Sequence, residues 1–161
     1  MKNTWVLVAD EAIARILQWQ ERGTGLDSVE EITDPDAHAD EAEFRRDAQG
    51  RRAGAAPHSS SDTPHRLRGA ASVTASAGED AQHLEGAAFA RRIADHLAEA
   101  LRDKRFDELQ IVAAPRFLGA LRKALSVEVR ATVSTETDKD LIHLDNRDLA
   151  TRLYTTRTAT Q

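Results

Sequence analysis

The chain has 161 residues, a length typical of one domain, with 40% hydrophobic residues, 30% charged residues and a formal net charge of −5. Because there is no cysteine, disulfide scaffolds, thiolate zinc sites and cysteine nucleophiles are excluded. The negative net charge argues against general coating of nucleic acid by the whole surface, but it leaves room for a local basic patch.

The amino terminus shows no export signal. Only about six residues of apolar character precede Asp10, which is too short for the apolar region of a signal peptide. The sequence also lacks the run of roughly 18 apolar residues that a transmembrane helix needs. We therefore expect a cytoplasmic protein without a membrane span.

The first part of the chain predicts three strands. Thr4 to Ala9 is apolar on both alternating faces, as in a central strand that is covered on both sides. A polar break then leads to an alternating run from Ala12 to Gln20, which predicts a hairpin, although this pattern does not exclude a helix. Leu26 to Thr33 has acids beside its apolar residues, which indicates an exposed or edge strand.

The second half alternates helices and strands. Apolar residues at spacings of three to five predict a helix from Leu84 on. A short strand follows at Leu109 to Ala114, and a second helix opens at Pro115 and runs to Leu125. The alternation in Val127 to Val133 predicts a half-buried strand, and Leu141 to Tyr154 predicts a third helix.

These elements predict a single α/β domain over residues 1–161. Their order, β-β-β-α-β-α-β-α, is typical of a mixed five-stranded sheet with helices and a ribonuclease-H-like topology. Aromatic residues make up only 4% of the chain, so the core should be mainly aliphatic. Its few large side chains are Trp5, Trp19, Phe89, Phe106 and Phe117.

A long polar, arginine-rich loop, residues 36–83, follows the third predicted strand. It holds few large apolar residues and therefore cannot contribute much core. Its central part, from Arg45 to Arg68, carries six arginines against two aspartates and is locally basic. Insertions of this length are usually functional loops or disordered linkers.

This basic loop is the first candidate site. Guanidinium groups bind phosphate oxygens through paired hydrogen bonds, and glycine lets a backbone approach closely. The alternative is a solvated loop whose arginines pair with nearby acids. The residues that would bind nucleic acid or phosphate are Arg45, Arg46, Gln49, Gly50, Arg51 and Arg52.

The second candidate is the predicted strand-to-helix turn at Pro115. A helix amino terminus favours an anion, and Arg116 and Arg122 would reinforce it. The structural alternative is that Pro115 starts the helix and Gly119 allows close helix packing. Arg122 would then form an ion pair, with Asp140 as one conceivable partner. The pattern favours this alternative, because proline removes one amide donor.

Catalytic signals are weaker. Ribonuclease-H-like folds can place acids around two divalent cations, but Asp10 is better explained as a turn residue, and the first strand contains no acid. The six histidines show no tight zinc spacing. We therefore expect no catalytic residue, metal or cofactor. The acids near predicted strand ends are Asp10, Asp107, Asp138 and Asp140.

Several runs of the sequence are recognisable together, and they resemble the bacterial host-attachment protein family over nearly the whole chain. The most specific run is Ala-Pro-Arg-Phe-Leu-Gly-x-Leu-Arg at residues 114–122. The other runs are Trp5 to Asp10, Ala14 to Ile16, Arg46 to Arg51, Phe89-Ala90 and Lys139 to Leu141.

The resemblance implies a role in attachment of bacteria to host cells, and a fold similar to the middle domain of archaeal and eukaryotic peptide-chain release factors. In those factors a Gly-Gly-Gln loop enters the peptidyl-transferase centre, whereas this chain offers only Gln49-Gly50. The kinship therefore implies an association with the ribosome, and the missing motif argues against hydrolysis of peptidyl-tRNA.

We therefore expect a non-enzymatic binding protein that contacts ribosome or RNA through the basic loop. One alternative is a hydrolase, either a metal-dependent nuclease or an enzyme directed at peptidyl-tRNA. Another is an indirect role in attachment to host cells. A structural or adhesion-related role would predict an exposed apolar patch and a stable homo-oligomer.

Overall fold

The computed structural model describes residues 2–20, 24–34 and 71–158. The chain divides into two compact units, one made of Met1–Asp34 with Gly86–Gln161 and the other of Pro35–Glu85. The strands and the buried core described below belong to the first unit.

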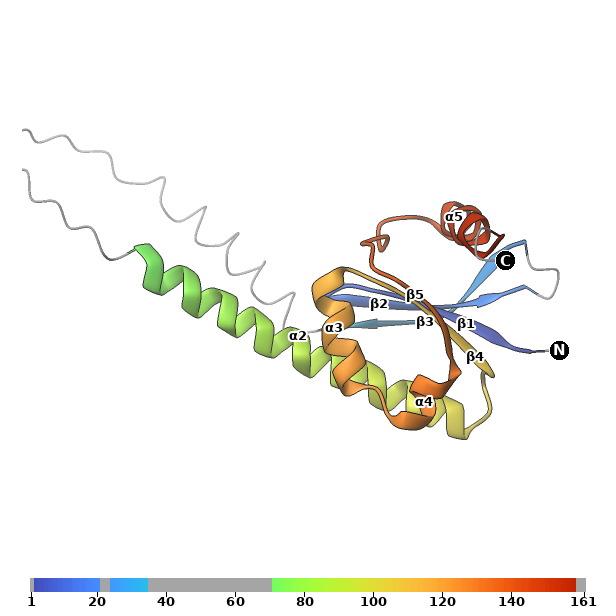
Figure 1. Cartoon of the computed structure of the whole chain (residues 1–161), viewed down its shortest axis with the longest axis horizontal. Helices are drawn as coiled ribbons and strands as arrows, with labels where there is room; N and C mark the ends of the chain where they lie inside the picture. Colours follow the sequence, from blue (N-terminus) through green and yellow to red (C-terminus); the bar gives the residue numbers. More distant parts are fainter. Residues whose placement is uncertain (1, 21–23, 35–70, 159–161) are drawn as a thin grey trace, which may run out of the picture. The chain divides into compact units, whose positions relative to one another are not determined.

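The first unit is built on a five-stranded sheet (Figure 1). In chain order the described elements are β1 (Thr4–Ala9), β2 (Ile13–Trp19), β3 (Leu26–Thr33), α2 (Ala71–Arg102), β4 (Glu108–Ala113), α3 (Pro115–Ala124), α4 (Val127–Thr132), β5 (Val133–Thr137) and α5 (Asn146–Thr158). The strand order is β3-β2-β1-β4-β5. The pairs β1–β2 and β2–β3 are antiparallel, whereas β1–β4 and β4–β5 are parallel. The predicted mixed sheet and ribonuclease-H-like topology are thus confirmed.

The central strand β1 explains why its sequence is apolar throughout. Side chains alternate across a strand, so Trp5 and Leu7 point to one face of the sheet and Val6 and Val8 to the other. Each of these four side chains is buried, because helices cover both faces. The strand pairs with β2 on one side and β4 on the other, as a central strand must.

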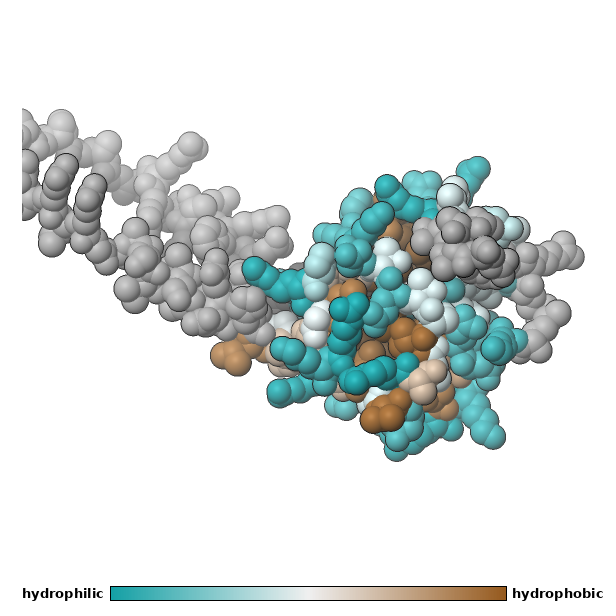
Figure 2. Space-filling view, viewed as in Figure 1, coloured by the Kyte–Doolittle hydropathy of each residue, from teal (hydrophilic) through white to brown (hydrophobic). Residues whose placement is uncertain are grey.

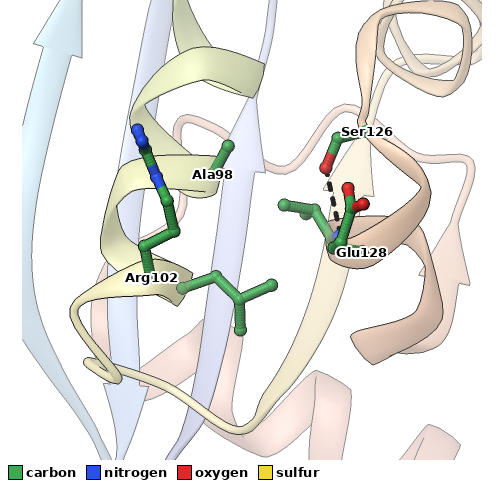
Figure 3. Close-up of a pocket in the computed structure, with 6 residues that line it drawn as sticks. Ala98, Arg102, Ser126 and Glu128 are labelled. Carbon is green, nitrogen blue, oxygen red and sulfur yellow. Dashed lines mark hydrogen bonds between the residues drawn. The ribbon is translucent and has the colours of Figure 1, made fainter.

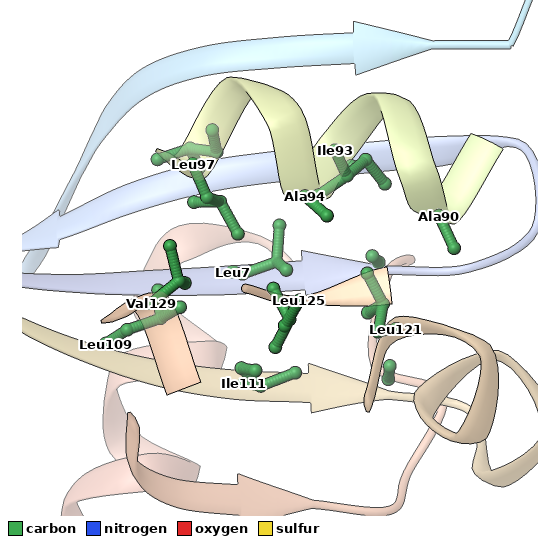
Figure 4. Packing of buried hydrophobic residues seen from close by; sticks show 14 of the residues in the cluster. Leu7, Ala90, Ile93, Ala94, Leu97, Leu109, Ile111, Leu121, Leu125 and Val129 are labelled. Carbon is green, nitrogen blue, oxygen red and sulfur yellow. The ribbon is translucent and has the colours of Figure 1, made fainter. Parts of the chain in front are cut away.

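The larger core lies between the sheet and the helices α2, α3 and α4 (Figure 4). Ile93 and Leu97 of α2 are fully buried there together with Leu121 of α3. The ring of Trp5 stacks on Phe106 with centroids 4.9 Å apart, and Phe89 and Phe117 lie 5.8 Å apart. The five large side chains predicted for the core, which include Trp19 on the opposite face, are all buried.

The second core lies on the opposite face of the sheet, under α5 (Figure 1). Leu149 and Leu153 of α5, and Leu141 before it, are buried against this face. The indole Nε1 of Trp19 donates a hydrogen bond to Gln110 Oε1 at 3.0 Å, which satisfies two polar groups inside this layer.

The strand predicted at Val127 to Val133 is wrong over its first part, because residues 127–132 form the short helix α4. Ser126 caps this helix: its Oγ accepts a hydrogen bond from Val129 N at 3.3 Å. Only Val129 is buried, whereas Val127 is 77% exposed. Residues 127–132 therefore bury one side chain instead of every second one. Strand β5 begins only at Val133.

Two helix boundaries also differ from the prediction. Helix α2 begins at Ala71 rather than at Leu84, and Leu84 is 73% exposed instead of part of the buried stripe. Helix α5 begins at Asn146 rather than at Leu141. Asp145 sets that start, since its Oδ1 accepts a hydrogen bond from Asp148 N at 2.8 Å.

Candidate functional site

The arginine-rich part of the loop, with Arg45, Arg46, Gln49, Gly50, Arg51 and Arg52, lies outside the described residues. Its role in binding stays a prediction. The residues that flank the loop in the first unit, Asp34 and Gly86, are described, and their contacts show where the loop leaves and rejoins this unit.

Both flanking residues lie beside the short connection between β1 and β2. Asp34 N donates a hydrogen bond to Ala12 O at 2.7 Å. A methyl group added at Gly86 would lie 3.7 Å from Glu11 Cγ, so α2 passes close to the same turn. The chain therefore leaves the first unit at Asp34 and re-enters it within α2 at Gly86, and both residues lie beside the end of the sheet where β1 ends.

Asp10 builds this turn rather than a catalytic centre. Its Oδ1 accepts hydrogen bonds from Ala12 N at 2.8 Å and from Ile13 N at 2.7 Å, while its own N donates to Ile13 O at 2.9 Å. An aspartate that accepts from the backbone two or three residues ahead is the usual way to fix a tight turn. The prediction that Asp10 is a turn residue is confirmed.

An ion pair fastens the end of β3 to α2. Arg92 Nη2 lies 2.6 Å from Asp34 Oδ1, and the Asp34 side chain is only 3% exposed. The Arg92 guanidinium also lies over the Phe89 ring, 5.3 Å from its centroid. These contacts hold the residue that precedes the loop in a fixed position on the first unit.

The amino terminus of α3 lies at the same edge. Ala113, at the end of β4, pairs with Ala9, at the end of β1, and Pro115 then opens the helix. Ala114 provides no side-chain hydrogen bond to the helix end. Arg116 is exposed, and among the described residues it has no hydrogen-bond or ion-pair partner. It is thus available to an anion that reaches this edge.

Arg122 is engaged elsewhere. Its Nε donates to Glu136 Oε2 at 2.8 Å, and this carboxylate, by hydrogen bonding and by its charge, raises the pKa of Arg122. The expectation of a structural ion pair therefore holds, but the partner is Glu136 on β5. Asp140, the partner considered from the sequence, accepts a hydrogen bond from Ile142 N at 3.3 Å.

The solvent face of α3 carries Arg116, Gly119 and Lys123, which lie on the side opposite the buried stripe. A methyl group added at Gly119 would meet nothing within 4 Å in the described part of the chain. Among the described residues, Gly119 does not serve close helix packing, so this interpretation is wrong there. Arg116 and Lys123 are thus exposed on either side of Gly119.

The four acids considered for metal binding do not form a centre. Asp107 precedes β4 and accepts a hydrogen bond from Asn3 N at 2.8 Å. It lies at the opposite end of the parallel strands from Asp10. Among the residues that the structure describes, no group of three His, Cys, Asp or Glu side chains could hold a metal ion.

The sequence alone does not reveal the structural role of Arg15. From β2 its guanidinium donates to the carbonyls of Ile142 at 3.0 Å and Leu144 at 2.6 Å, and to Asn146 Oδ1 at 2.6 Å. Asn146 Nδ2 in turn donates to Leu26 O at 3.2 Å. Arg15 thus fixes the approach to α5, which no local pattern reveals because the partners are more than 120 residues away.

The sequence also gave no sign of a groove of about 480 Å³ between the end of α2 and the start of α4. Ala98 and Arg102 line it from α2, and Ser126 and Glu128 line it from α4 (Figure 3). The remaining lining residues are Leu101 and Val129. Figure 2 shows apolar surface near α4, with hydrophilic residues beside it.

Comparison with known proteins identifies the family of the chain. Residues 5–153 match the model of the family described as "protein required for attachment to host cells". The search of curated proteins gives no match. None of the described helices is long and apolar enough to cross a membrane. The likeness to peptide-chain release factors is outside the family match and stays a prediction.

Proposed function

The chain belongs to the host-attachment family, and from this premise we propose that it is a non-enzymatic binding protein that contacts ribosome or RNA through its basic loop. The observation that carries the proposal is the local excess of arginine between residues 45 and 68 in a chain whose net charge is −5. Within the first unit, Arg116 of α3 is exposed at the end of the sheet where β1 and β4 finish.

The local charge of the chain supports a polyanionic partner. The six arginines between residues 45 and 68 stand in a chain of net charge −5, so the basic character is local. Arg116 and Lys123 add two exposed cations on the solvent face of α3. Phosphate groups are the anions that arginines bind most effectively through paired hydrogen bonds, and an RNA backbone offers a row of them.

The geometry favours binding over hydrolysis. Asp10 and Asp107, two of the acids that a nuclease would need, make backbone hydrogen bonds at opposite ends of the strands. A two-metal centre requires acids that converge on cations about 4 Å apart. Attachment to host cells would then be an indirect consequence of an interaction with RNA.

The experiment measures co-sedimentation of the full chain with ribosomes, and its binding to RNA, over a series of salt concentrations. We expect binding that weakens as salt rises, because each neutralised phosphate releases counterions. Replacing Arg46, Arg51 and Arg52 with alanine should weaken binding and flatten the salt dependence. The matched control replaces Lys2, Lys104 and Arg147, three exposed cations on other parts of the chain.

Two outcomes would overturn the proposal. The first is absence of binding at low salt, and the second is equal binding by the loop variant and the control variant. Cleavage of RNA that requires a divalent metal and is lost in Asp10→Ala would instead establish the nuclease alternative. This last variant needs a check by thermal unfolding, because Asp10 builds a turn.

A further inference from the structure

The groove between α2 and α4 has an apolar floor and is open to solvent. Leu101 and Ala98 of α2 are only half-buried, although each packs against the larger core. Val129 closes the floor from the side of α4. Its volume of about 480 Å³ is large enough for side chains from another molecule.

A protruding apolar residue lies next to this groove. Val127 is 77% exposed, and its two neighbours in the chain, Ser126 and Glu128, both line the groove. An exposed apolar side chain gains significance where it adjoins other apolar surface, as Val127 does here. The same surface therefore offers an apolar side chain and an apolar hollow.

The walls of the groove carry opposite charges. Arg102 comes from α2 and Glu128 from α4, on the two sides of the groove (Figure 3). Arg102 has a contact of 3.8 Å with Glu99, but both side chains are more than two-thirds exposed, so this pair is weak. A partner that fits these walls must present a negative group to α2 and a positive group to α4.

We propose that the partner is a second copy of this chain, docked about a two-fold axis at the α2–α4 groove. A two-fold interface uses the same patch on both subunits, so the patch must be complementary to itself. Here Val127 enters the groove of the other copy. Arg102 faces Glu128 of the partner subunit, and the symmetry axis repeats that pair.

The dimer should be weak and dependent on concentration. The groove accommodates only a few side chains, and small interfaces are typical of transient complexes. The charge pairs at its rim set the orientation and exclude wrong partners more than they add affinity. Sedimentation velocity of the full chain at increasing protein concentration should therefore show a rising fraction of dimer.

Charge reversal supplies the decisive test. Arg102→Glu and Glu128→Arg each place like charges across the axis, so each variant alone should be monomeric at concentrations where the wild type is a dimer. An equimolar mixture of the two variants restores opposite charges at both pairs and should form a heterodimer. Val127→Asp should abolish the dimer, and Arg147→Glu, an exposed change on α5, should leave it intact.

Thermal unfolding of each variant separates loss of docking from loss of folding. A wild-type chain that stays monomeric at every concentration would overturn the proposal. A dimer that survives Val127→Asp would also overturn it, because the two copies would then use another surface. So would a mixture of the two charge variants that stays monomeric, because Arg102 and Glu128 would then not pair across the axis. None of these outcomes depends on whether the chain binds RNA.

Discussion

Arg92 Nη2 lies 2.6 Å from Asp34 Oδ1, and the two side chains differ sharply in exposure, at 46% for the arginine and 3% for the aspartate. The carboxylate is therefore inside the protein while its partner reaches in from the surface. This pair joins Asp34, the residue directly after β3, to α2. It fixes the position from which the chain leaves the first unit.

Replacing Arg92 with methionine should lower the free energy of unfolding by about 1–3 kcal/mol, since it removes the cation from a buried carboxylate. Methionine keeps apolar contact with the Phe89 ring, so the loss reports mainly on the charge. Chemical denaturation measures the change. Arg91→Met, on an exposed neighbouring position, is the control and should shift stability far less. Equal losses would contradict the importance of the pair.

Ser126→Ala should destabilise the protein by about 1 kcal/mol, because the hydroxyl caps α4 by accepting from Val129 N. Ser126→Asp should retain most of the stability, since aspartate is an equally good capping residue. Thermal unfolding compares these variants with Ser134→Ala, in which only a long contact of 3.4 Å to Leu109 O is lost. A full loss in Ser126→Asp would show that the cap is not the cause.

Glu128 links this cap to pH. Its own backbone N–H, followed by the Ser126 side chain, lowers the pKa of the Glu128 carboxyl. A pKa that is lower in the folded state contributes stability above the unfolded value, and this stability is lost as pH falls through the folded pKa. Glu128→Gln should therefore reduce the dependence of stability on acid, measured by urea unfolding from neutral to acidic pH. The effect should shrink in a Ser126→Ala background, and an unchanged effect there would contradict the contribution assigned to the Ser126 side chain.

Gly119→Ala should raise the free energy of unfolding by about 0.5–1 kcal/mol, because alanine is the better helix former and the new methyl group meets no neighbour. Gly25→Ala is the contrasting variant. There the methyl group would lie 2.6 Å from Gln20 Oε1, so the side chain must move and no gain is expected. Loss of stability in Gly119→Ala would show that the helix face is covered after all.

The strands of the sheet could be predicted from local patterns, because the order of apolar and polar residues along each strand reflects which of its faces is buried. Thr4 to Ala9 is apolar on both faces, and it lies between two covered faces of the sheet. The prediction of a strand at Val127 to Val133 was wrong because the pattern there does not correspond to burial. Its alternation suggests a buried face, but the Ser126 cap and the single buried Val129 decide for a helix. A serine just before a run with Glu128 in the first turn was the available signal.

The candidate site was predictable only in part. Residue type and position identified Asp10 as a turn residue, since its partners are two and three residues away. The partner of Arg122 is Glu136, and that choice depends on how α3 packs beside β5. The groove beside α4 depends on a helix that the alternating pattern conceals. The local sequence determines neither the partner of Arg122 nor the presence of this groove.

The contacts of Asp34 and Gly86 with a single turn have a consequence for how such chains can diverge. Asp34 is bonded to Ala12 and Gly86 of α2 lies beside Glu11, and neither arrangement depends on how many residues separate Asp34 from the start of α2. The entropic cost of closing a connection between two fixed points grows only slowly with its length. Insertions and deletions between them should therefore accumulate in the family with little cost to the core, whereas a change of one residue in the Asp10 turn should be selected against.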